Sequence, residues 1–258
     1  SSITVPDSVK NLGVGAFFGC SELTSVTIGS GVTKIEETTF ESCSNLSSIT
    51  IPDNVTSIDS NAFYKCSNLL SIVIGSGLSS IERQTFPYCE KLVAISVDEN
   101  NLTYSSQNGL LLSKDGKTVI QGVNGDVTIP NGVTKIGRDA FYSCSGLTTI
   151  TIPNSVTNID QTAFEGCSGL ASITIPSSVA IINHNALGSC SSLKTIVCLR
   201  TIAPTVASQT FGYNQYGVIT FTGWKTHSDG TNVLKIPQGA VGYTSSYWGS
   251  VLLDSTRN

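Results

Sequence analysis

The sequence predicts an α/β repeat protein, a right-handed solenoid in which short coils stack with a parallel β-sheet on one face. Two observations carry this prediction. Cysteine, leucine and phenylalanine each recur every 23 residues in two long series. Within each unit, apolar residues stand two apart over a few positions, which is the spacing of a strand with one buried face. The recurring positions are the cysteines at 20, 43, 66, 89, 144, 167 and 190, the leucines at 23, 46, 69, 92, 147, 170 and 193, and the phenylalanines at 17, 40, 63, 86, 141 and 164, with Leu187 as the seventh member.

Each unit is expected to begin with a strand that a proline or a glycine-rich turn ends. In residues 144–166 the inward positions of this strand are Ile150 and Ile152, and Pro153 follows. Proline stops a strand because it has no N–H group for the ladder. In two other units the Gly-Ser-Gly segments at 29–31 and 75–77 take the place of proline.

The second half of each unit is expected to return along the other face through a short helical or 3₁₀ turn. A second apolar pair is followed by an Ala-Phe pair, which is Ala163-Phe164 in the same unit. Asp59, Asp160 and Asn183 stand a few residues before this position, where they could cap one turn. A single unit cannot bury its own apolar stripe, so successive units must stack, about 4.8 Å apart.

One interruption and one change of composition set the domain boundaries. Leu92 and Leu147 are 55 residues apart, which leaves an insertion at about residues 98–126. In this insertion Asp115-Gly116 lies between two apolar runs at 110–112 and 118–120, and the pattern predicts a β-hairpin that stands out from one coil. The repeat region is therefore residues 1–200, and residues 201–258 are expected to form a C-terminal cap that packs on the last coil.

The composition excludes several classes of protein. Of the 258 residues, 40% are hydrophobic, which is enough for a core and excludes a disordered chain. The net charge is −4 and the basic residues are scattered, which argues against binding to nucleic acid. No apolar run is long enough to predict a transmembrane segment. The chain begins at Ser1 and contains no methionine, which favours a mature or trimmed product that lacks its signal peptide.

The cysteines have two readings. Their spacing lacks the tight pairs of zinc sites, so no metal site is predicted. A buried ladder of free thiols is favoured, because cysteines in the same frame point the same way on adjacent coils. Disulfides are the alternative, with Cys190 to Cys198 as one pairing. Cys198 also occupies a strand position that isoleucine fills in other units, where it would act as a small apolar side chain.

Two groups of residues are candidates for ligand binding. The outward strand positions carry hydroxyl groups, which either form a binding face or simply suit a solvated sheet. The C-terminal aromatic residues either stack on a ligand or form the core of the cap. The candidates are Ser25, Thr27, Ser48, Thr50, Thr149, Thr151, Ser172 and Thr174 on the sheet, and Tyr213, Tyr216, Trp224, Tyr243 and Trp248 in the C-terminal segment. Exposed aromatic residues are also expected at Phe18, Tyr64 and Tyr142, directly after the buried phenylalanine.

No catalytic residues or cofactors are predicted. His184 and His227 are isolated, and the sequence contains no nucleophile elbow, zinc-protease motif or phosphate-binding loop. A glycan-active enzyme would depend on Asp229 and Asp254 alone, so it is the least favoured hypothesis. The expected function is therefore non-enzymatic.

The unit C-x-x-L-x-x-I-x-I-P-x-x-V-x-x-I-x-x-x-A-F resembles the BspA-like leucine-rich repeats. The resemblance covers about residues 1–200, and the segment with Ile236-Pro237 and Trp248 is similar to the family's C-terminal caps. It implies a right-handed leucine-rich-repeat solenoid in a secreted or cell-surface protein of host-associated bacteria. The expected function is protein or glycan binding, with adhesion to a host extracellular protein or glycan by a monomer. The alternative is a structural spacer that presents another part of a larger surface protein.

Overall fold

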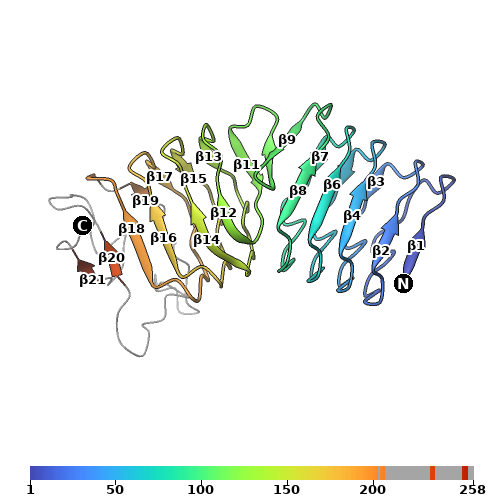
Figure 1. Cartoon of the computed structure of the whole chain (residues 1–258), viewed down its shortest axis with the longest axis horizontal. Helices are drawn as coiled ribbons and strands as arrows, with labels where there is room; N and C mark the ends of the chain where they lie inside the picture. The colour runs from blue at the N-terminus through green and yellow to red at the C-terminus, as the bar shows by residue number, and fades with distance from the viewer. Residues whose placement is uncertain (203, 207–232, 236–251, 255–258) are drawn as a thin grey trace. The chain divides into compact units, whose positions relative to one another are not determined.

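The computed structural model describes residues 1–202, 204–206, 233–235 and 252–254, and these residues form strands and turns (Figure 1). They divide into two units. The first unit contains residues 1–117 and 121–124, and the second contains residues 118–120 and 125–258. Each unit is a stack of coils whose repeat strands pair in parallel, so the solenoid predicted from the repeat is confirmed within each unit.

The coils of the first unit contribute strands to two faces. On the first face, Ser48 pairs with Ser71 and Ser71 pairs with Ala94, so the register advances by one 23-residue repeat. The strands of this face are β1 (Ser2–Thr4), which pairs with β2 (Ser25–Thr27), and β4 (Ser48–Ile51), β6 (Ser71–Ile74) and β8 (Ala94–Val97). The second face consists of β3 (Lys34–Ile35), β5 (Ser57–Ile58) and β7 (Ser80–Ile81).

The second unit repeats this arrangement. Ser172 pairs with Thr195 and Thr195 pairs with Val233, which are again parallel. The strands of its first face are β12 (Gly125–Thr128), which pairs with β14 (Leu147–Thr151), and β16 (Ser172–Ile175), β18 (Thr195–Cys198), β20 (Val233–Lys235) and β21 (Leu252–Asp254). Its second face contains β11 (Thr118–Gln121), β13 (Lys135–Ile136), β15 (Asn158–Ile159), β17 (Ile181–Ile182) and β19 (Thr205–Val206).

The core of each unit consists of columns of identical side chains. In the first unit the rings of Phe17, Phe40, Phe63 and Phe86 stack with centroids 5.2–5.3 Å apart. In the second unit the rings of Phe141 and Phe164 stack at 5.1 Å. The rings are nearly parallel because the stacking of coils repeats the same rotamer at each level, and stacked rings add to the burial of apolar area. The apolar stripe of the repeat is thus the core.

The helical or 3₁₀ turns expected beside the Ala-Phe position do not form in the described residues, which corrects the prediction. The N–H group of Phe40 donates to the carbonyl of Ala62, and that of Ser42 donates to the carbonyl of Tyr64, both on the next coil. Alternate N–H groups of this segment therefore join the ladder between coils. A helix needs those same groups for bonds within the segment.

Left-handed residues interrupt the same segment at every fourth position. Thr38 and Ser42 have φ angles of 56° and 61°, and Asn61 and Lys65 repeat them one coil later at 56° and 58°. A non-glycine residue in this region is uncommon and ends a right-handed helix. The local pattern therefore favours single turns over a helix.

Asp59, Asp160 and Asn183, which were expected to cap these turns, join adjacent coils instead. The Nζ atom of Lys34 lies 2.8 Å from Oδ2 of Asp59, and Nζ of Lys135 lies 2.7 Å from Oδ2 of Asp160. The Nδ2 group of Asn183 donates to Oδ1 of Asp160 at 3.2 Å. Without a helix to cap, these polar side chains bond along the stack.

The insertion contains a hairpin that lies one strand before the predicted one, and both predicted segments form strands of one sheet, β10 (Leu110–Ser113) and β11. The antiparallel pair is β9 (Tyr104–Gln107) with β10 (Leu110–Ser113), joined by Asn108-Gly109. The φ angles of these two residues are 54° and 77°, as a two-residue hairpin turn requires. Asp115-Gly116 forms a separate turn, in which the Gly116 N–H group donates to the carbonyl of Ser113.

The hairpin packs against the first unit and does not stand out from it. The N–H group of Ile95 in β8 donates to the carbonyl of Gly109. The fully buried side chain of Asn101 donates to the carbonyls of Gly75 and Leu78, both at 3.0 Å. Its Oδ1 atom accepts from the N–H groups of residues 103 and 104. One buried amide therefore makes four hydrogen bonds, two to the preceding coil and two within the insertion.

We expect Phe141→Ala to lower the free energy of unfolding by about 3–5 kcal/mol, because this ring is fully buried and stacks on Phe164. Phe18→Ala is the matched control, since Phe18 is 60% exposed and its truncation should cost less than about 0.5 kcal/mol. Urea unfolding followed by circular dichroism measures both. A loss below about 1 kcal/mol for Phe141→Ala would show that the phenylalanine column does not form the core.

We expect Asn101→Ala to destabilise the protein by more than about 2 kcal/mol, because it leaves two buried carbonyls and two N–H groups without a partner. Asn100→Ala, at the exposed neighbour, serves as the control. Hydrogen exchange of the Tyr104 amide reports the local effect directly. Unchanged protection of that amide in Asn101→Ala would contradict the assigned role.

Candidate functional site

The hydroxyl face predicted for the first unit is exposed. Ser25 and Thr27 lie on β2 and Ser48 and Thr50 lie on β4, and all four alternate with buried residues. Their hydroxyl groups make no hydrogen bond to the part of the chain that the structure describes. A serine or threonine hydroxyl can donate one hydrogen bond and accept two. These four groups are therefore available to a ligand, and their role in binding stays a prediction.

In the second unit one of the four predicted hydroxyls already makes a hydrogen bond within the chain. Thr149, Thr151, Ser172 and Thr174 are all exposed, on β14 and β16. The hydroxyl of Thr149 donates to Oδ1 of Asp126 at 2.8 Å, as does the neighbouring Thr148. These bonds from Thr149 and Thr148 lower the pKa of Asp126 because they stabilise its charged form. The first face of the second unit therefore carries a fixed negative charge at Asp126.

Three exposed apolar residues lie on or directly before the strands of the hydroxyl face of the first unit. Leu70 is 47% exposed, Val73 45% and Val93 51%. Leu70 and Val93 occupy the same repeat position on adjacent coils, and the Val93 N–H group donates to the Leu70 carbonyl. Val73 lies on β6 between Thr50 of β4 and Ser96 of β8. These three residues, named the apolar patch below, could have been found from the sequence as the outward positions that depart from serine and threonine.

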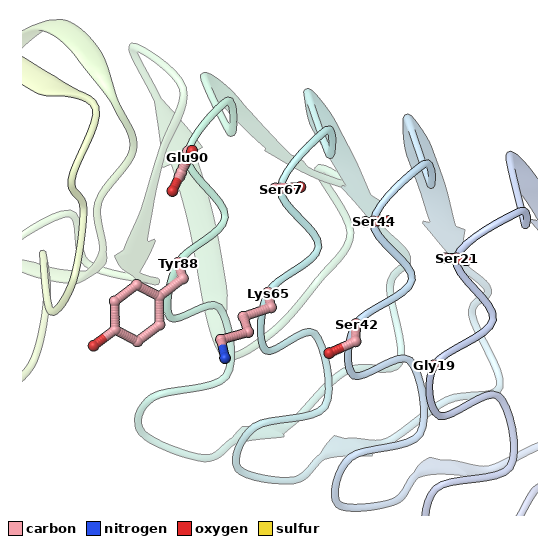
Figure 2. Close-up of a pocket in the computed structure, with 8 residues that line it drawn as sticks. All are labelled: Gly19, Ser21, Ser42, Ser44, Lys65, Ser67, Tyr88 and Glu90. Atoms are coloured by element: carbon pink, nitrogen blue, oxygen red, sulfur yellow. The ribbon is translucent and has the colours of Figure 1, made fainter.

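A groove of about 530 Å³ runs along the first unit beside the cysteine column (Figure 2). It is formed by the residues one position before and one position after each cysteine. This feature, named the serine groove below, was missed in the sequence, although the two columns that flank the cysteines would have located it. Its lining residues are Gly19, Ser21, Ser42, Ser44, Lys65, Ser67, Tyr88 and Glu90.

The predicted aromatic candidates differ in exposure and in whether the structure describes them. Phe18 is 60% exposed, whereas Tyr64 and Tyr142 are half-buried. The C-terminal candidates lie outside the described residues, and so does most of the expected cap. The candidates outside are Tyr213, Tyr216, Trp224, Tyr243 and Trp248.

All eight cysteines are free thiols, so the proposed Cys190–Cys198 disulfide is wrong and the thiol ladder is supported. Seven are buried, including Cys198 at its strand position, and Cys20 is exposed. The Sγ–H group of Cys66 donates to the carbonyl of Phe40 on the preceding coil at 3.1 Å. The same bond recurs at Cys43, Cys89, Cys167 and Cys190. The thiols therefore connect adjacent coils.

Burial makes these thiols hard to ionise. It raises the pKa of Cys43 from the ordinary 9.0 to about 11, and those of Cys144 and Cys190 to about 12. Because the thiolate is the reactive form, these cysteines are chemically inert at neutral pH.

The second unit brings together acidic groups that are far apart in sequence. Burial raises the pKa of Glu165, and the nearby charge of Asp139 raises it further, against the opposing effect of His184. Thr162 donates a hydrogen bond to Asp139, which also lies 3.9 Å from Nε of Arg138.

Within the described ranges, no three histidine, cysteine, aspartate or glutamate side chains are placed to hold a metal ion. The same part of the chain contains no helix long and apolar enough to cross a membrane.

The parallel coils, with their leucine, phenylalanine and cysteine columns, define the class of leucine-rich-repeat solenoids. A family model described as the BspA type leucine rich repeat region matches residues 1–108 and 124–227 in six copies. The chain therefore belongs to the BspA-type leucine-rich-repeat family, as its repeat unit predicts. A comparison with curated proteins finds no match.

Solved structures of other bacterial proteins share the fold. A leucine-rich repeat protein from Eubacterium ventriosum is 22% identical, with a TM-score of 0.62 over 93% of this chain and 67% of its own. A leucine rich cell surface protein from Faecalibacterium prausnitzii is 23% identical, with a TM-score of 0.53 over 100% of this chain and 83% of its own. The pneumococcal vaccine antigen PcpA is 19% identical, with a TM-score of 0.52 over 100% and 78%.

We expect a thiol reagent at about pH 8 to modify Cys20 rapidly and the seven buried cysteines only after unfolding. Mass spectrometry of the labelled protein locates the modified residue, and Cys20→Ser should abolish labelling of the folded protein. Rapid modification of Cys66 or Cys167 in the folded protein would contradict the buried ladder.

The same thiols predict a loss of stability in alkali. Their pKa is higher in the folded than in the unfolded protein, so the folded state binds more protons above the ordinary thiol pKa. Their contribution is therefore complete below about pH 9 and is lost as the pH rises toward 12. Urea midpoints measured across this range should fall. Cys66→Ala combined with Cys167→Ala should reduce the slope, whereas Cys20→Ala should not.

Proposed function

We propose that this chain is a non-enzymatic binding module of a secreted or cell-surface protein, and that it adheres to an extracellular protein of a host. The observation that carries the proposal is the apolar patch of Leu70, Val73 and Val93, which lie on or directly before strands β6 and β8 of a face whose other outward residues are mostly serine and threonine. Membership of the BspA-type family supports it, as do the related folds of a cell surface protein and a vaccine antigen. Single exposed apolar residues need no explanation, but a cluster on one face marks an interaction site.

The arrangement matches the usual anatomy of a protein interface. An apolar centre is surrounded by polar groups that stay accessible at the rim. Here the rim is formed by Ser48, Thr50 and Ser71, which flank the patch along the strands. The outward strand columns on the first face of the first unit carry no charged residue. Binding on this face should therefore depend little on ionic strength, because salt screens charge interactions and not apolar burial.

Leu70→Glu combined with Val93→Glu should weaken binding at least about tenfold, because it places two charges in the centre of the interface. The measurement is surface plasmon resonance against a panel of purified host extracellular-matrix proteins. Leu102→Glu is the matched control, since Leu102 is 86% exposed but lies on a loop outside the sheet face.

Two outcomes would contradict this proposal. The first is the absence of saturable binding to any protein of the panel, which would favour the spacer. The second is binding that Leu102→Glu weakens as much as the double substitution, which would place the contact elsewhere.

A further inference from the structure

The serine groove of the first unit consists of two parallel columns of side chains. Gly19, Ser42, Lys65 and Tyr88 precede the four cysteines, and a second column follows them. Figure 2 shows both columns running across successive coils, with Lys65 and Tyr88 projecting near one end. The second column is Ser21, Ser44, Ser67 and Glu90. An elongated groove of this kind suits a linear ligand that extends across several coils.

The hydroxyl groups that line this groove have unused hydrogen-bonding capacity. Ser21, Ser42, Ser44 and Ser67 make no side-chain hydrogen bond to the described part of the chain. Elsewhere in the same unit serine hydroxyls bond along the stack, as at Ser47, whose hydroxyl donates to the Thr24 carbonyl. The groove therefore offers donors and acceptors that recur about every 4.8 Å, the spacing of adjacent strands.

The backbone fixes the positions of these side chains. Ser42, Lys65 and Tyr88 all have φ angles between 58° and 61°. The Ser42 N–H group bonds to the next coil at residue 64, and the Lys65 N–H group bonds to the next coil at residue 87. Each side chain therefore leaves a backbone that is held by its neighbouring coil. A ligand that binds such a preorganised surface loses less conformational freedom.

Tyr88 provides an aromatic surface at one end of the groove. Tyr88 is 39% exposed. Its ring lies edge-on to the ring of Tyr64, with the ring centroids 5.4 Å apart and an angle of 80° between the ring planes. Lys65 Nζ lies 5.1 Å from the Tyr64 ring centroid, which places a cation beside the same pair. A tyrosine ring held in this way combines an apolar face with a polar hydroxyl, which suits a ligand that is apolar on one side and polar on its edge.

The charges and the lining residues of the serine groove favour some classes of ligand over others. Lys65 and Glu90 have opposite signs, so the groove has no net charge to attract a polyanion. No aliphatic side chain lines it, so it offers no pocket for the apolar anchors of a peptide. We propose that the serine groove binds a neutral linear oligosaccharide, which places a sugar ring against Tyr88 and its hydroxyl groups along the serine columns. This site is separate from the sheet face and does not depend on the protein-binding proposal.

The test is isothermal titration of the whole chain with three neutral pentasaccharides, chitopentaose, cellopentaose and maltopentaose. We expect saturable binding of at least one of them. Tyr88→Ala should weaken it about tenfold, whereas Tyr88→Phe should retain most of the affinity because it keeps the ring. Tyr88 is exposed, so both variants should fold.

A matched pair of triple substitutions tests the hydroxyl columns. Ser42→Ala with Ser44→Ala and Ser67→Ala should weaken binding of the same pentasaccharide, whereas Ser25→Ala with Ser48→Ala and Ser71→Ala on the sheet face should not. Thermal unfolding of both variants confirms that the coils remain stacked. The proposal is overturned by a lack of saturable binding of all three sugars, by wild-type affinity in Tyr88→Ala, or by a loss confined to the sheet-face variant. None of these outcomes bears on binding of a protein to the apolar patch.

Discussion

The hydrogen bonds that join each coil to the next are the constraint on which the structure depends. At five levels the phenylalanine carbonyl accepts from the cysteine N–H group of its own turn and from the thiol of the following coil, as Phe40 does from Cys43 and Cys66. Both donors reach the same oxygen only if the next cysteine stands in the same place one coil later. This requirement explains why the spacing of 23 residues is kept so strictly. It also explains why cysteine suits the position, since a thiol is a small apolar group that can still donate.

The same bonds decide the shape of the backbone opposite the sheet. Because alternate N–H groups of the Phe turn point to the next coil, the turn cannot satisfy itself as a helix. The left-handed residues that result hold Ser42 and Lys65 at fixed positions beside the cysteines. The serine groove is therefore a consequence of coil stacking. The sheet face arises from the other half of the coil, where alternation of side chains leaves Ser48 and Thr50 outward. The two proposed surfaces thus have different chemistry because they come from different parts of one repeat.

The insertion shows how a repeat array can accommodate an irregular segment. Asn101 joins the insertion to the repeat, because its side chain bonds to two carbonyls of the preceding coil and to two N–H groups of its own segment. The sequence pattern missed β9 because this strand is polar and lacks the apolar alternation by which strands are recognised. Asn108-Gly109 was the stronger turn signal, since these two residues tolerate the positive φ angles that a tight hairpin needs.

The sequence by itself determined the period, the inward columns and the outward hydroxyls of this protein, because each depends only on spacing along the chain. Phe63 and Ile72 are buried where the repeat predicts them, and Thr27 is exposed. The tertiary structure decided what the stacked side chains contact. The partner of a thiol, the unused hydroxyl of Ser67 and the clustering of Leu70 with Val93 are all relations between coils. Such relations exist only when residues 23 positions apart are brought to adjacent levels, and a local pattern does not contain them.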